Sequence, residues 1–191
     1  MIEPDRSLIR HPATPAPMIH AVDAGIAVLA DGCVAFRYRL RGDMARIRIP
    51  AEGPPERSDS LWEHTCFEAF AGLEGEPGYR EFNFSPSGQW AVHDFGDYRS
   101  RLADPALAAP RIRTRATPGR LELEAVVPLS SLPFAPGGAA WEIGLSAVIE
   151  AADMPGDGLS HWALRHSSPR PDFHLRDGFA LRQASLRRPS R

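Results

Sequence analysis

The sequence predicts an all-β protein, a single domain built as an antiparallel two-sheet β-sandwich of jelly-roll type. Three observations lead to this fold class. Short segments of alternating apolar and polar residues recur along the chain, aromatic and β-branched residues fill them, and 19 Pro and 16 Gly separate them. No segment has the sustained apolar spacing of a long helix. With 191 residues, the chain is long enough to bury one sizeable core.

The clearest strands are three consecutive ones expected at residues 66–72, 79–85 and 89–95, with the sequences CFEAFAG, YREFNFS and QWAVHDF. Aromatic side chains are dense in all three, and a tight SPSG turn joins the second to the third. We expect these strands to form an antiparallel meander at the centre of the sandwich.

The two faces of this meander differ in chemistry, because successive side chains of a strand point to opposite sides. Phe82 and Phe84 share one face, which the pattern predicts to be apolar. The opposite face mixes aromatic residues with a polar set: Glu68, Glu81, Asn83 and either His93 or Asp94. Such a face is either solvated exterior or a ligand platform, and the pattern leaves both open.

The rest of the chain adds further short strands and loops. We expect an N-terminal strap or short strand over 1–17, the domain itself over 18–186, and a disordered tail over 187–191. Residues 18–31 are ambiguous, since Ala favours a helix whereas Gly25 favours a strand. Further expected elements are strands at 33–40, 45–50, 141–151 and 179–185, a loop at 51–60, a helical turn at 105–109 and a hairpin over 111–129.

Composition narrows the classes of partner and compartment. The formal charge is −2 and every one of the 22 basic residues is Arg, which gives no electrostatic case for nucleic acid or an anionic membrane. No segment is a signal peptide or an apolar membrane span. The two cysteines, Cys33 and Cys66, suggest neither a disulfide framework nor a metal site, so we expect a cytoplasmic protein with reduced thiols.

Three separated blocks carry a resemblance to a known family. They are LWEHTCFEAF, YREFNFSPSGQWAVHDFGDYR and SHWALRHSSPRPDFH, followed by a closing FAL. In this order they resemble bacterial DOMON-like domains, which are related to the family 9 carbohydrate-binding modules. The resemblance covers roughly residues 15–186. It implies a two-sheet antiparallel sandwich that binds a sugar or haem, and it leaves the ligand itself open.

A sugar site needs flat aromatic rings for stacking and polar side chains for the hydroxyl groups. Trp62 is well placed for stacking, at a strand entrance after a polar loop, whereas Trp90 in mid-strand and Trp141 in a regular apolar alternation are more typical of a core. The candidate ligand-binding residues are Trp62, His64, Glu68, Asn83, Trp90, Arg99, His161, Trp162 and His166.

The leading hypothesis is a non-catalytic module that binds a small molecule or sugar, without a cofactor and without catalytic residues. One alternative is a glycoside hydrolase using paired carboxylates from the set Glu63, Glu68, Glu81 and Asp94. A second, implied by the resemblance, is a haem-binding domain with His and Met axial ligands, although Met18, Met44 and Met154 all lie outside the three blocks. A third is a protein-interaction domain. No His spacing is typical of a metal site, and the oligomeric state is not predicted.

The first and third blocks, 61–70 and 161–174, are expected to lie close together and line a pocket. Both concentrate His, Trp and acidic residues beside loops rich in Pro and Gly. The alternative is a structural clamp in the segment PRPDFH, in which Pro169 and Pro171 stiffen the loop, Asp172 caps a turn, and His174 satisfies a buried backbone group.

Overall fold

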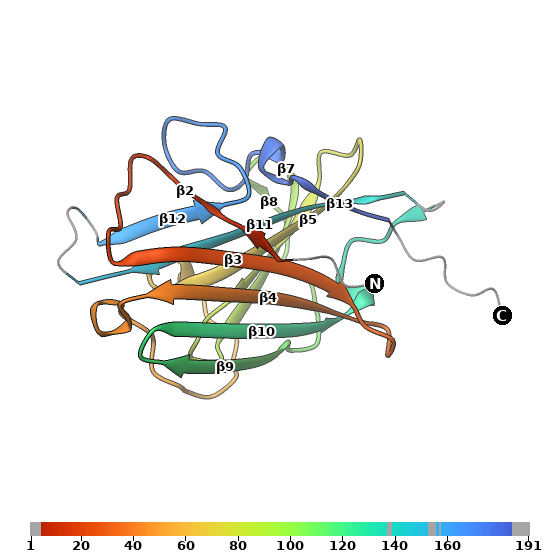
Figure 1. Ribbon diagram of the computed structural model, residues 1–191. Coiled ribbons are helices and arrows are strands. Elements are labelled where there is room, and N and C mark those ends of the chain that lie inside the picture. The colour runs from red at the N-terminus through yellow and green to blue at the C-terminus, as the bar shows by residue number, and fades with distance from the viewer. Residues whose placement is uncertain (1–4, 137–138, 153–155, 157, 185–191) are drawn as a thin grey trace.

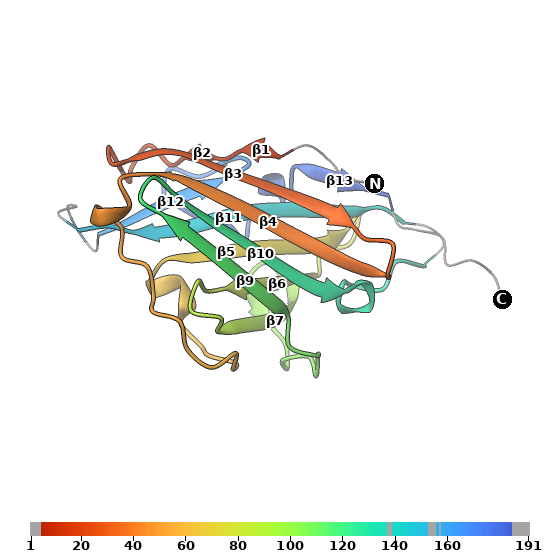
Figure 2. The same ribbon diagram turned by 60° about the horizontal axis from the view of Figure 1, so that its bottom comes forward.

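The computed structural model describes residues 5–136, 139–152, 156 and 158–184, which form two antiparallel sheets packed face to face (Figure 1). The predicted all-β sandwich is therefore confirmed. Seen from below, the five-stranded sheet lies across the eight-stranded one (Figure 2). Within the described residues, none of the helices has the length and apolar character needed to cross a membrane.

The five-stranded sheet runs in the order β1 (Arg6–Ser7), β3 (Ile19–Val28), β4 (Cys33–Gly42), β10 (Arg120–Pro128) and β9 (Arg111–Thr117). The eight-stranded sheet runs in the order β2 (Ile9–Arg10), β12 (Leu159–Ala163), β11 (Trp141–Glu150), β5 (Cys66–Leu73), β6 (Tyr79–Phe84), β7 (Trp90–Asp97) and β8 (Ser100–Arg101), and β13 (Leu181–Gln183) also pairs with β11. The short 3₁₀ helices are η1 (Met44–Arg46), η2 (Leu61–Glu63), η3 (Leu129–Ser131) and η5 (Arg176–Gly178).

The core lies between the sheets and follows the predicted alternation. Phe36 of β4 meets Phe82 and Phe84 of β6, with ring centroids 5.8 and 5.7 Å apart. All three rings are completely buried. The central meander was predicted with the correct faces: Phe82 and Phe84 share the face that packs against the opposite sheet.

Two predicted elements are wrong. Residues 45–50 do not form a strand, because the Asp43 side chain accepts a hydrogen bond from the Ala45 amide and starts helix η1 instead, leaving a single bridge between Ile47 and Ala151. Residues 105–109 have no helical turn, since Pro110 cannot donate a helical hydrogen bond and disfavours a helical conformation for the residue before it. The ambiguous segment at 18–31 forms strand β3, with Gly25 inside it.

The N-terminal strap is part of both sheets. Arg6 and Ser7 pair with β3, whereas Ile9 and Arg10 pair with β12, so the chain crosses from one layer to the other within five residues. The predicted disordered tail at 187–191 lies outside the described residues.

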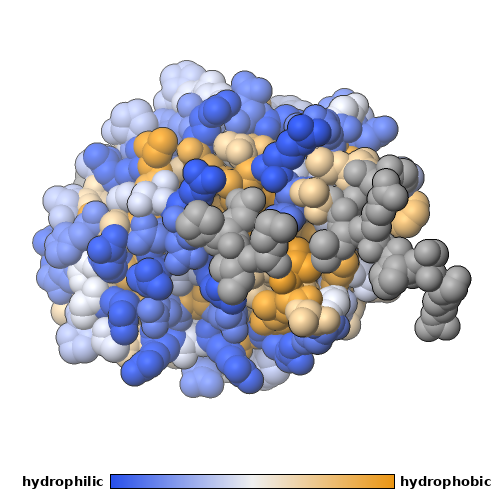
Figure 3. All heavy atoms as spheres, turned by 45° about the vertical axis from the view of Figure 1, so that its right-hand side comes forward, coloured by the Kyte–Doolittle hydropathy of each residue, from blue (hydrophilic) through white to orange (hydrophobic). Residues whose placement is uncertain are grey.

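Few large apolar side chains are exposed among the described residues, and the surface seen in Figure 3 is mostly hydrophilic, with hydrophobic residues in small areas between. Phe134 is the most exposed of them, at 81%. It therefore serves as a reference for a phenylalanine outside the core.

Phe82→Ala is expected to destabilise the fold by about 4 kcal/mol, because it removes a fully buried ring and leaves a cavity between the sheets. Urea unfolding followed by circular dichroism would measure this change. The matched change Phe134→Ala should alter the free energy of unfolding by less than about 0.5 kcal/mol. Similar effects for both variants would contradict the assigned core.

Candidate functional site

The outer face of strands β5, β6 and β7 forms the floor of the candidate site. Because side chains alternate, Glu68, Glu81 and His93 point away from the core, opposite Phe67, Phe82 and Val92 of the same strands. In register, Glu81 lies directly across from His93, and Glu68 directly across from Asn83. All four side chains are at least nine-tenths buried, so this face is not a solvated exterior.

A loop covers this floor. We call it the cap loop, residues 164–180, between β12 and β13 (blue in Figure 1). Its Phe179 packs against Phe70, with ring centroids 5.5 Å apart, in a cluster on the outer face of the sheet. Gly144 permits this contact, because a Cβ there would come within 3.0 Å of the Phe179 ring. Two of the glycines in the sequence, Gly144 and Gly72 beneath Arg176, thus let the cap loop approach the sheet closely.

Asp172 fastens the cap loop to the β7–β8 hairpin. Its Oδ1 accepts a hydrogen bond from the His174 amide at 3.0 Å and an ion pair from Arg99 at 3.0 Å. Its Oδ2 accepts from the Tyr98 hydroxyl at 2.6 Å. Burial alone would raise the pKa of Asp172, but these hydrogen bonds and the Arg99 charge lower it below its ordinary value. The expected cap of a turn by Asp172 is confirmed.

The His174 part of the clamp hypothesis is wrong. Its Nδ1 contacts the Tyr79 hydroxyl at 2.8 Å rather than a backbone group, and its ring stands edge-on to Phe70 and Phe95. Burial, together with the nearby Arg99 charge, lowers the pKa of His174 to about 4. The imidazole is therefore uncharged at neutral pH.

Between the floor and the cap loop lies a cavity of about 380 Å³. Blocks 61–70 and 161–174 both contribute to its wall, as expected from the sequence. Its lining residues are Trp62, Glu68, Glu81, His93, Phe95, Arg99, Arg101, Val148, His161, Pro171, Asp172, Phe173 and His174.

Helix η2 places Trp62 at the edge of the cavity. Leu61 packs onto Cys66 and Ala91 of the floor, so the next side chain is held away from the sheet, with 40% of Trp62 exposed. Two non-glycine residues in the described chain have positive φ, Ser60 at 61° and Arg99 at 52°. One precedes this helix and the other lines the cavity, so both unfavourable backbone conformations lie at the candidate site.

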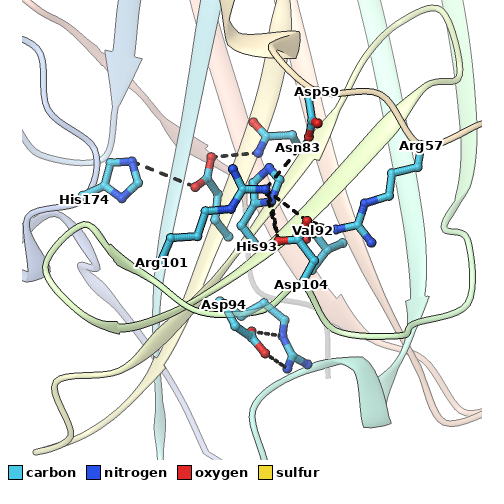
Figure 4. A network of polar contacts seen from close by, with 11 residues as sticks. Arg57, Asp59, Asn83, Val92, His93, Asp94, Arg101, Asp104 and His174 are labelled. Carbon is cyan, nitrogen blue, oxygen red and sulfur yellow. Dashed lines mark hydrogen bonds and ion pairs between the residues drawn. The ribbon is translucent and has the colours of Figure 1, made fainter.

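A network of charged side chains closes the β7–β8 side of the cavity (Figure 4). His93 Nδ1 lies 3.0 Å from Asp104 Oδ1 and 2.8 Å from the Arg101 guanidinium. Arg101 and Arg57 both form ion pairs with Asp104, at 3.0 and 2.9 Å. Arg101 also lies 4.0 Å from Asp59, so Arg57 and Arg101 face two carboxylates, and Arg99 is paired with Asp172. Each of these guanidinium charges is therefore balanced by an aspartate.

The two carboxyls of the floor, Glu68 and Glu81, affect each other's ionisation. Burial, and then repulsion from Glu81, raise the pKa of Glu68 well above its ordinary value. Burial also raises the pKa of Glu81, but a hydrogen bond from the Asn83 amide at 2.7 Å and the neighbouring cationic side chains oppose the rise. Burial therefore favours the neutral form of Glu68, whereas the Asn83 hydrogen bond and the nearby cationic side chains favour the charged form of Glu81.

The structure brings together four of the nine predicted site residues: Trp62, Glu68, Arg99 and His161 line the cavity. Asn83 is fully buried just behind the floor, where it donates to Glu81. Trp90 and Trp162 lie in the core between the sheets, at 7% and 6% exposure, because alternation directs them inward.

The other two candidates lie elsewhere on the surface. His64 is exposed and pairs with Glu150 at 2.9 Å. His166 lies at the base of the cap loop, where its Nε2 contacts the Ile9 carbonyl at 2.8 Å and holds β2 in place. Neither residue lines the cavity.

Several lining residues were not predicted as binding residues. Glu81 and His93 could have been found, because both share the polar face already recognised from the alternation. Arg101 lies in the two-residue strand β8, which is too short to show alternation. Phe173 and His174 lie in block 161–174, which was expected to line a pocket, but their loop has no periodicity that would single them out.

The described part of the chain favours neither a metal nor a haem. It contains no group of three or more His, Cys, Asp or Glu residues arranged to hold a metal ion. For haem, Met18 is buried in the core and Met44 packs against it, so neither can reach the cavity, and Met154 lies outside the described residues. The expected Met–His ligation therefore does not fit the described residues.

Comparison with known proteins shows the fold. No family model matches the chain, and no curated protein matches it. The resemblance to DOMON-like domains thus stays an expectation. Among solved structures, a "putative carbohydrate-binding protein" from Bacteroides uniformis is similar, with a TM-score of 0.55 and 17% identity over 83% of this chain and 75% of that one.

A second similar structure is a family 9 carbohydrate-binding module from Caldicellulosiruptor kristjanssonii in complex with cellotriose. Its TM-score is 0.47, with 9% identity over 82% of this chain and 72% of that chain. The likeness to the Bacteroides uniformis structure, at 17% identity, shows the β-sandwich fold alone.

Asp172→Ala is expected to release the cap loop, because it removes three contacts between this loop and the β7–β8 hairpin or within the loop itself. Amide hydrogen exchange of residues 165–178 should become faster, and stability should fall by about 1–3 kcal/mol. Asp177→Ala, an exposed change in the same loop, is the control. Unchanged exchange after Asp172→Ala would refute the clamp.

Glu68→Gln is expected to stabilise the protein increasingly as pH rises. The pKa of Glu68 is raised in the folded state, so its protonated form is favoured there; this contribution is present below the unfolded pKa and is lost as pH rises through the folded pKa. The glutamine side chain of the variant cannot ionise, so the variant should not lose stability in this way as pH rises. The melting temperature of the variant minus that of the wild type, followed between pH 4.5 and 8.5, measures the effect.

The control for this titration is Glu63→Gln, since Glu63 is exposed on η2. Its difference from the wild type should stay constant over the same pH range. A constant difference for Glu68→Gln as well would show that Glu68 is not held protonated on the floor.

Proposed function

We propose that the protein is a carbohydrate-binding module that takes a neutral sugar unit into the cavity beneath the cap loop. The observation that carries this proposal is the pairing, in one cavity, of an exposed indole at the edge with a floor of hydrogen-bonding groups. Trp62 offers a flat apolar surface to a pyranose ring, and Glu68 and Glu81 offer polar atoms to its hydroxyls.

The electrostatics support a neutral ligand. Arg99 and Arg101 are both paired with aspartates, so an anionic ligand would have to compete with these ion pairs. Burial raises the pKa of Glu68 well above its ordinary value and so favours the neutral carboxyl, which can both donate and accept a hydrogen bond. Hydroxyl groups, which also donate and accept, match such a lining better than charged groups do.

The size of the site and the fold agree with this proposal. A cavity of about 380 Å³ lies in the usual range for small-molecule sites and suits one or two sugar rings. The similar structure from Bacteroides uniformis is described as a carbohydrate-binding protein, and it shares the sandwich on which this cavity is built. Fold likeness alone does not assign the ligand, so the argument depends on the residues of the cavity.

Glycoside hydrolysis receives less support from the same geometry. The two carboxyls must flank the scissile bond. Here Glu68 and Glu81 project side by side from adjacent strands of one floor, as diagonal neighbours in the register. Asp94 is engaged by Arg80 through two contacts of 2.6 and 2.7 Å, and neither Asp94 nor Glu63 lines the cavity.

Trp62→Ala is expected to weaken sugar binding by about tenfold or more, because the variant loses the stacking surface. Isothermal titration with cellotriose, cellobiose, glucose, galactose, mannose and xylose would measure this change. Since the side chain is partly exposed, the melting temperature should change little. Phe134→Ala, an exposed aromatic away from the cavity, should leave binding intact.

Two results would count against a binding module of this kind. No saturable binding by the wild type to any of these sugars would refute the proposed function. Release of nitrophenol from nitrophenyl glycosides, abolished by Glu81→Gln, would favour the hydrolase instead.

A further inference from the structure

Arg99, Tyr79 and His174 form a chain of two hydrogen bonds beside the cavity, of which the first has a fixed direction. The Arg99 amide donates to the Tyr79 hydroxyl oxygen at 3.1 Å, since a backbone N–H can only donate. The Tyr79 hydroxyl then has its own proton available for His174 Nδ1, which lies 2.8 Å away. With the hydroxyl proton of Tyr79 directed at His174, Nδ1 of His174 is the acceptor of this hydrogen bond.

The tautomer of His174 follows. An uncharged imidazole carries one proton, and with Nδ1 accepting from Tyr79, that proton is on Nε2. The low pKa of His174, about 4, keeps the ring uncharged at neutral pH. The ring is held in place by edge-on contacts with Phe70 and Phe95, at centroid distances of 5.3 and 5.1 Å. The cap loop thus presents an oriented N–H donor to the floor.

The group opposite this donor is Glu81. Its Oε1 accepts from the Asn83 amide at 2.7 Å, whereas its Oε2 lies 3.9 Å from His174 Nε2. This separation is too long for a hydrogen bond. His174 and Glu81 therefore do not bond to each other, and both residues line the cavity, where a ligand can reach them. The Nε2–H needs an acceptor, and a carboxylate Oε2 needs a donor.

We propose that His174 and Glu81 together select one hydroxyl group of the bound sugar, which accepts from His174 Nε2–H and donates to Glu81 Oε2. An oxygen about 2.8 Å from each atom fits their 3.9 Å separation, with an angle of about 90° at the oxygen that a small movement of the cap loop can widen. This inference rests on the proposed function. It adds that a deoxy sugar or a methyl ether at that position is rejected, because neither can both donate and accept.

Tyr79 is then a positioning residue, and its effect on the tautomer can be tested without a ligand. In long-range ¹H–¹⁵N spectra of the free protein at pH 7, His174 is expected as the Nε2–H tautomer, its signals being assigned by their loss in His174→Phe. Tyr79→Phe should reduce this preference. Tyr98→Phe is the matched control, since that hydroxyl bonds to Asp172 of the same cap loop and not to an imidazole. An Nδ1–H tautomer in the wild type would overturn the inference.

Sugar binding tests the selection itself. His174→Phe keeps an aromatic ring among Phe70 and Phe95 but removes both nitrogens. It should weaken binding of the best parent sugar, taken from cellotriose and methyl β-glucoside, by about tenfold. The single-deoxy analogue that the wild type binds worst should be bound equally well by wild type and variant. A variant that merely perturbs the fold would instead lose affinity for both ligands alike.

The outcomes separate the two proposals. If the wild type binds none of the probes, the proposed function fails and the hydroxyl-selecting role fails with it. If the wild type binds but His174→Phe and Tyr79→Phe bind and discriminate as the wild type does, only this inference fails. Tyr79→Phe, which retains the ring in the Phe70 and Phe95 cluster, supplies the second variant should His174→Phe melt at a much lower temperature.

Discussion

Strands β5, β6 and β7 are buried on both faces, and the rest of the structure depends on what covers the outer one. A sandwich needs only its inner faces shielded from water. Here the outer face carries Phe70, Tyr79 and Phe95 at one end and two carboxyls beside them, so leaving it open would expose a sizeable apolar area. The cap loop resolves this by placing Phe179 on the aromatic end and leaving a cavity over the polar end.

The buried carboxyls at the polar end of this face lower the stability of the fold, so their presence there calls for an explanation. Burying carboxyl groups side by side raises the pKa of both and disfavours their charged forms. A structure under selection for stability alone would place apolar residues at such positions. The hydrogen bonds from Asn83 and Ser146 offset part of this penalty. The remaining penalty, and the positive φ of Arg99 in the cavity wall, are features that the proposed sugar binding would account for.

The sequence predicted the architecture well because strand alternation is a local signal. The periods of β4, β10 and β11, and the opposed faces of the meander, follow from side-chain geometry alone. The same rule recognised the polar face with Glu68, Glu81 and Asn83. It failed where a side-chain hydrogen bond redirected the backbone, as Asp43 does before η1.

The candidate site was only half predictable for a related reason. The residues of its floor can be predicted from the alternation of the strands. Its roof depends on where the seventeen-residue cap loop lies, and that follows from tertiary contacts such as the ion pair of Asp172 with Arg99. Tryptophan was a poor guide by itself, since Trp90 and Trp162 follow the alternation into the core. Only Trp62, displaced from the sheet by helix η2, reaches the cavity.

The pairing of β12 and β13 with one strand has a consequence for how such proteins can diversify. Both strands pair with β11: β12 pairs with its residues 146–150 and β13 with its residues 141–143. The cap loop therefore begins and ends at strands that are hydrogen-bonded to β11. Its two ends are therefore fixed by the sheet whatever lies between them. The entropy of closing a loop grows slowly with its length, so insertions or replacements here would disturb folding little. The roof can be exchanged as a unit over an unchanged floor, which would let one scaffold acquire different ligands.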